Sequence, residues 1–135
     1  MPIQSKNLTI AALVALIFGA LTVFSGGRAL FGGADAEAAV GNAVAFVLWF
    51  NFLAGFAYML AGVGLFLRHR PAVWISIALF VSTALVGLAL GYHVLQGGAF
   101  EMRTVGAMML RTAVWAAISV VAVRHIARPT VAKNN

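Results

Sequence analysis

The stretch NFLAGFAYMLAGVGLFLRHRPAVW, residues 51 to 74, joins the end of one apolar run to the start of the next through a short basic turn. Arg68 and Arg70 suit the C-terminal end of a helix, where cations meet the negative end of the helix dipole. Pro71 suits the first turn of a following helix, because it has no backbone N–H to leave unpaired. The segment therefore predicts two membrane-spanning helices that meet in a tight turn.

The composition of the whole chain agrees with a membrane protein. Of its 135 residues, 63% are hydrophobic and 9% are charged, whereas a soluble domain is about half apolar and about a quarter charged. The absence of cysteine excludes disulfides, thiol nucleophiles and cysteine-ligated metals. The net charge of +6 comes from basic residues spaced beside apolar runs, which is a topology signal, and we expect no nucleic-acid partner.

Four apolar runs predict four transmembrane helices, at about residues 8–25, 39–68, 72–96 and 102–127. The expected fold class is an all-α integral membrane protein, a four-helix bundle in which residues 1–135 form a single domain. The first run is also compatible with a secretory signal peptide, because Lys6 precedes it and small residues follow. It is longer than the apolar region of a usual signal peptide, so we expect a retained helix.

The distribution of charges predicts the orientation. In a four-span chain, the N-terminus, the second loop and the C-terminus share one side, which carries basic residues and no acid: Lys6, Arg68, Arg70, Arg124, Arg128 and Lys133. The other side balances three arginines with three acids: Arg28, Arg103 and Arg111 with Asp35, Glu37 and Glu101. The positive-inside rule then predicts an inner-membrane protein with both termini in the cytoplasm.

The two halves of the chain share a short pattern. RALFGGADAEAAVGNAV (28–44) and HVLQGGAFEMRTVGAMM (93–109) match at six positions at a fixed offset of 65 residues. Each would end an outgoing helix with a glycine pair and place an acid near the start of the returning helix. Two duplicated helical hairpins are one explanation, and chance matches among common glycines and alanines are the other.

Small residues recur at helical spacing in three of the runs, which allows helix backbones to approach closely. Such stripes pack helices within one chain or join two copies in a homo-oligomer, and both readings stay open. The stripes are Ala11, Ala15 and Gly19; Gly87 and Gly91; and, together with two polar residues, Asn51, Gly55, Tyr58 and Gly62.

The last apolar run holds Arg111, about 12 Å from its outer end at 1.5 Å per residue. An arginine inside a membrane is costly and is therefore a candidate for function. Its side chain leans toward the outer side, where Asn51 lies at a similar depth. The candidate ligand-binding residues of this outer layer are Arg111, Asn51, His93, Glu101, Arg103, Tyr58, Tyr92 and Thr112.

This layer has two interpretations. One is a cavity for an anionic or quinone-like head group with Arg111 as its main cation, and the other is an internal ion pair of Arg111 with Glu101, Asp35 or Glu37.

No catalytic residue is expected, because no nucleophile motif or phosphate-binding glycine loop is present. No metal site is expected either. Haem is disfavoured because only His69 and His125 share one end of the predicted bundle and both look like interfacial residues, whereas His93 lies at the other end. A quinone or a lipid is the expected cofactor, if one is bound.

The quoted segment 51–74 resembles the second helix and following turn of DoxX-like membrane proteins. In these proteins a polar residue, a glycine-rich helix with a GLFLR-type ending and a short turn recur in a four-helix bundle. The resemblance covers this segment, the chain length and the number of spans. It implies a small inner-membrane component of quinone-linked or thiol redox systems, often with a soluble partner. Without cysteine, only a quinone or accessory role carries over.

The sequence thus favours an accessory or lipophilic-ligand-binding membrane protein with a polar site in the outer half of its bundle. A quinone- or haem-linked redox subunit and a small oligomeric transporter or channel are the alternatives, and an enzyme is less favoured than a binding protein. The expected partners are the lipid bilayer and either another membrane protein or a second copy of the chain.

Overall fold

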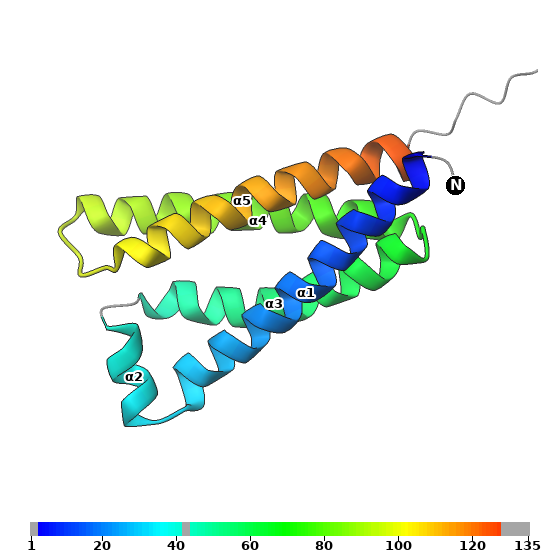
Figure 1. Ribbon diagram of the computed structural model, residues 1–135. Helices are drawn as coiled ribbons and strands as arrows, with labels where there is room; N and C mark the ends of the chain where they lie inside the picture. The colour runs from blue at the N-terminus through cyan, green and yellow to red at the C-terminus, as the bar shows by residue number, and fades with distance from the viewer. Residues whose placement is uncertain (1–2, 42–43, 128–135) are drawn as a thin grey trace, which may run out of the picture.

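The computed structural model describes residues 3–41 and 44–127, and all regular structure within these ranges is helical. Four long apolar helices pack against one another (Figure 1): α1 (Ile3–Phe31), α3 (Ala45–Phe66), α4 (Pro71–Leu95) and α5 (Met102–Ala122). A π-helical turn, η1 (Val123–Ala127), continues α5. Each long helix is apolar enough to cross a membrane. The predicted all-α bundle of four transmembrane helices is therefore confirmed.

The second helix starts later than the sequence pattern indicated. A short helix, α2 (Ala34–Val40), follows α1 and is capped by Gly41, and the span α3 begins only at Ala45. Gly41 has a φ of 61°, which side-chain-bearing residues rarely adopt, and the Glu101 side chain occupies the space where its Cβ would stand. The expected helix over 39–68 is thus interrupted, and α2 is too short to cross a bilayer.

The long helices pair as two hairpins. α1 packs along α3, α4 packs along α5, and α3 joins the pairs by packing on α4. Figure 1 shows the pairs close together at the end that holds the N-terminus and the α3–α4 turn, and further apart at the end that holds α2. We call these the basic end and the α2 end, because exposed Lys6, Arg68, Arg70 and Arg124 lie at the first.

Three of the predicted charged groups and the predicted hairpin duplication stay predictions. Arg128, Lys133 and the side chain of Glu37 lie outside the described residues. The hairpin duplication also stays a prediction. The glycine with positive φ is the second of its pair in the first loop, Gly33, but the first of its pair in the other loop, Gly97.

Glycines bring α1 and α3 into backbone contact. A Cβ added at Gly19 would lie 2.8 Å from the carbonyl oxygen of Gly55 and 3.0 Å from the backbone nitrogen of Met59. The stripe that contains Gly19 therefore packs helices within one chain. Gly87 and Gly91 on α4 differ, because a Cβ at either would meet no atom within 4 Å.

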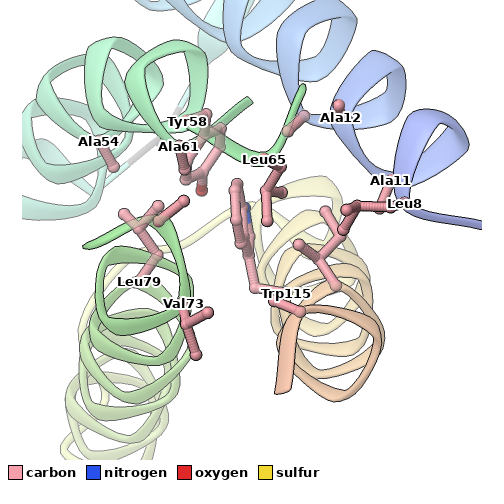
Figure 2. Packing of buried hydrophobic residues seen from close by; sticks show 14 residues of the cluster. Leu8, Ala11, Ala12, Ala54, Tyr58, Ala61, Leu65, Val73, Leu79 and Trp115 are labelled. Carbon is pink, nitrogen blue, oxygen red and sulfur yellow. The ribbon is translucent and has the colours of Figure 1, made fainter. Parts of the chain in front are cut away.

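The largest buried side chain, Trp115 of α5, fills the centre of the bundle. Its ring centroid lies 4.9 Å from that of Tyr58 on α3, which in turn lies 5.7 Å from that of Phe18 on α1. Figure 2 shows Trp115 inserted among the helices, with Leu65 and Tyr58 beside it. This aromatic contact ties α5 to the α1–α3 pair.

Candidate functional site

The Arg111 side chain connects α5 to α1. Its Nη1 donates a hydrogen bond of 2.8 Å to Oγ1 of Thr22, and its guanidinium carbon lies 5.0 Å from the centre of the Phe18 ring. A cation above an aromatic face is attracted by about 0.5–2 kcal/mol. The contacts that Arg111 makes with Thr22 and Phe18 join α5 to α1. The ion-pair interpretation, with Asp35, Glu37 or Glu101 as the partner, stays a prediction.

Arg111 lines a cavity of about 290 Å³ between α1, α3 and α5, which we call the Arg111 cavity. This volume is at the lower edge of the range for small-molecule sites, roughly 300–1,000 Å³. Polar groups from three helices meet here inside the membrane-spanning part of the bundle. The lining residues other than Arg111 are Thr22, Ser25, Gly26, Ala29, Leu48, Asn51, Glu101, Arg103, Thr104 and Ala107.

Two buried polar atoms of residues that line this cavity have no hydrogen-bond partner within the described ranges: Nε of Arg111 and Oδ1 of Asn51. Buried polar atoms are almost always paired, and an unpaired one costs about 1–3 kcal/mol, more when it is charged. One atom is a donor and the other an acceptor. A bound group that accepts from Arg111 and donates to Asn51 would satisfy both.

The outer part of the cavity is attached to α2. Nη2 of Arg103 donates a hydrogen bond of 3.1 Å to the carbonyl oxygen of Ala39, and Glu101 packs against Gly41. Both Arg103 and Glu101 line the cavity as well. The start of α5 therefore serves at once as a wall of the cavity and as the attachment of α2.

Four of the predicted site residues lie away from the cavity. Tyr58 is buried in the aromatic core. Oγ1 of Thr112 donates to a carbonyl one turn back on α5, at 2.8 Å, and this residue borders a groove between α4 and α5. His93 pairs with the carbonyl oxygen of Ala99 at 2.9 Å, and Tyr92 is exposed. The structure thus brings together Arg111, Asn51, Glu101 and Arg103 alone from the predicted set.

Thr22, which accepts a hydrogen bond from Arg111, was not among the predicted site residues. The signal was present, because Thr22 and Gly26 continue the stripe of Ala15 and Gly19 at helical spacing. A threonine in a stripe that faces another helix is a natural partner for a buried cation. Phe18, under the guanidinium, has no comparable signal, because apolar residues surround it in the sequence.

No protein-family model, curated protein or solved structure matches this chain. The resemblance of residues 51–74 to DoxX-like membrane proteins accordingly stays a prediction. The chemistry of the cavity follows from its own residues.

Proposed function

We propose that this protein is an accessory membrane protein that binds a lipophilic ligand, with the ligand's head group in the Arg111 cavity. The single observation that carries the proposal is the unpaired donor and acceptor on Arg111 and Asn51, two residues that line one cavity. A fold that leaves both atoms buried pays for them in stability unless something binds there.

The charges of the cavity favour a head group that is rich in oxygen. Arg111 and Arg103 outweigh Glu101, so the lining carries one excess positive charge. A carbonyl, carboxylate or phosphate oxygen would accept from the guanidinium, and a hydroxyl would also donate to Asn51. The reduced form of a quinone and the head group of a lipid both offer this chemistry. The cavity volume of about 290 Å³ suits a head group, with its chain among the surrounding lipid.

Native mass spectrometry of gently solubilised protein tests the proposal. Wild type should retain an adduct whose mass distinguishes a quinone from a phospholipid. Arg111→Ala should lower its occupancy about 10- to 100-fold, the effect of losing a hydrogen bond to a charged group. Arg28→Ala is the matched control, because this exposed arginine lies on α1 outside the cavity lining. The same spectra record whether the protein is bound to a second copy or to another protein.

Asn51→Leu is a second variant, which separates loss of the ligand from loss of the fold. It removes an unpaired buried oxygen, so we expect the fold to keep or gain stability, while adduct occupancy falls. A wild type without any adduct, or an adduct equally retained in Arg111→Ala and Asn51→Leu, would contradict ligand binding at this cavity.

We further propose an inner-membrane location with both termini in the cytoplasm. The basic end supports this orientation, because its described residues include four exposed basic side chains and no acid, whereas Asp35 and Glu101 lie at the α2 end. The chain has no cysteine, so a single introduced thiol can be followed. A membrane-impermeant maleimide applied to intact cells should label Gln96→Cys and spare His69→Cys. The reverse pattern would invert the topology.

A further inference from the structure

A second cavity lies at the basic end of the bundle, beside the last turns of α5. It measures about 280 Å³ and is lined by Ser119 and Val120 of α5 and by Val123 and Arg124 of η1. None of these residues lines the Arg111 cavity. We call it the Ser119 pocket.

The Ser119 hydroxyl is buried and unused. The residue is 8% exposed, and its Oγ has no hydrogen-bond partner among the described residues. A serine inside a helix can donate to the carbonyl four residues back, as Ser76 does to Ala72 at 2.8 Å. Ser119 does not, so its buried hydroxyl is left with an unused donor beside the pocket.

Arg124 adds a positive charge to the same pocket. It lies five residues beyond Ser119, about 7.5 Å along the helix axis, and side chains lean toward the N-terminal end of their helix. The Arg124 side chain therefore leans from the membrane surface toward Ser119. The C-terminal end of a helix carries only about half a negative charge, which the full charge of Arg124 outweighs.

The surroundings of the pocket favour an anion at the membrane surface. Lys6, Arg68 and Arg70 are also exposed at the basic end, and no acid accompanies them among the described residues. Basic residues clustered beside the end of a transmembrane helix attract anionic lipids. Val120 and Val123 supply an apolar wall between the charge and the hydroxyl.

We propose that the Ser119 pocket binds one anionic glycerophospholipid. Its phosphate lies against Arg124, and an ester carbonyl, deeper in the membrane, accepts a hydrogen bond from Ser119. The polar groups of such a lipid span the interval between a surface cation and a buried donor, which a free phosphate does not. This site is separate from the ligand site of the Arg111 cavity and does not depend on it.

Native mass spectrometry of delipidated protein, titrated with defined lipids, tests the assignment. Phosphatidylglycerol should bind at least about 10-fold more tightly than phosphatidylethanolamine, which carries no net charge, and inorganic phosphate should not compete. Ser119→Ala should weaken phosphatidylglycerol binding about 2- to 10-fold, the effect of one neutral hydrogen bond. Arg124→Gln should weaken it about 10-fold or more, as expected for a charge-assisted contact.

Two controls separate this site from its alternatives. Arg70→Gln removes an exposed charge at the same end and should leave binding within about 2-fold of wild type, and Arg111→Ala should do the same. Equal weakening by Arg70→Gln and Arg124→Gln would reduce the effect to a general surface charge and overturn the proposal. Unchanged binding in Ser119→Ala, equal binding of both lipids, or competition by inorganic phosphate would each overturn it as well. Ser119→Ala removes an unpaired hydroxyl, so loss of fold is not an expected explanation of its phenotype.

Discussion

Replacing Gly19 by alanine tests whether α1 and α3 are held in backbone contact. The new Cβ would lie 2.7 Å from Cγ of Met59, 2.8 Å from the carbonyl oxygen of Gly55 and 3.0 Å from the backbone nitrogen of Met59. The methionine side chain can move aside, but the other two atoms belong to the α3 backbone. The helices must therefore separate, by several tenths of an ångström.

The expected cost follows from comparison with an open glycine. Overpacking a tight interface costs about 1–3 kcal/mol, while alanine returns up to about 1 kcal/mol as the better helix former. Gly91→Ala gains the same propensity and meets no atom within 4 Å. The difference in free energy of unfolding between the two variants therefore isolates the packing term, about 1–3 kcal/mol in favour of Gly91→Ala.

Reversible unfolding in mixed micelles of dodecylmaltoside and dodecyl sulfate measures this difference. With the exposed Trp49 and Trp74 replaced by phenylalanine, tryptophan fluorescence reports the core, because Trp115 is fully buried there. Circular dichroism reports helix content. Gly19→Ala should unfold at a lower fraction of dodecyl sulfate than wild type and Gly91→Ala at the same or a higher one. Coincident transitions for the two variants would refute the backbone contact between α1 and α3.

Three further changes have defined outcomes. Trp115→Ala should lower the free energy of unfolding in the same micelles by about 3–5 kcal/mol, because it empties the centre of the bundle; a loss below about 1 kcal/mol would mean that the core collapses around the gap. Tyr58→Phe should be neutral or stabilise by up to about 1 kcal/mol, because the Tyr58 hydroxyl has no partner within the described residues; clear destabilisation would show that a bound molecule pairs with it. Arg103→Ala should speed amide hydrogen exchange in α2 without affecting α5, because it breaks the hydrogen bond to Ala39; unchanged exchange in α2 would contradict that attachment.

The spans are predictable because a bilayer imposes a length and requires every backbone group to be paired inside a helix. The interruption between α2 and α3 is not predictable in this way. The stretch from Ala34 to Val47 contains good helix formers and few breakers, and only Gly41 and Asn42 hint at the turn. The Glu101 side chain comes from a loop 60 residues away and occupies the space that a Cβ at position 41 would need. It therefore opposes a continuous helix there.

The depth of the candidate residues along their helices could be predicted from the sequence, but the direction of their side chains around the helix axis could not. Counting along a helix places Arg111 and Asn51 at similar depths, and the two do line one cavity. The same counting cannot say which way a side chain points around the helix axis. Thr112, one residue from Arg111, therefore borders a different groove, and Thr22, which accepts a hydrogen bond from Arg111, was not among the predicted residues.

The pairing of α1 with α3 has a consequence for biosynthesis. The ribosome completes α1 at Phe31 but does not complete its partner α3 until Phe66, a delay of about 2–7 s at 5–20 residues per second. During that interval the nascent α1 presents its glycine face to lipid or to the insertion machinery. The α4–α5 hairpin, made last, closes onto a pair already locked. Slowing translation between residues 31 and 66 should therefore expose the chain to quality-control proteases more than slowing it later.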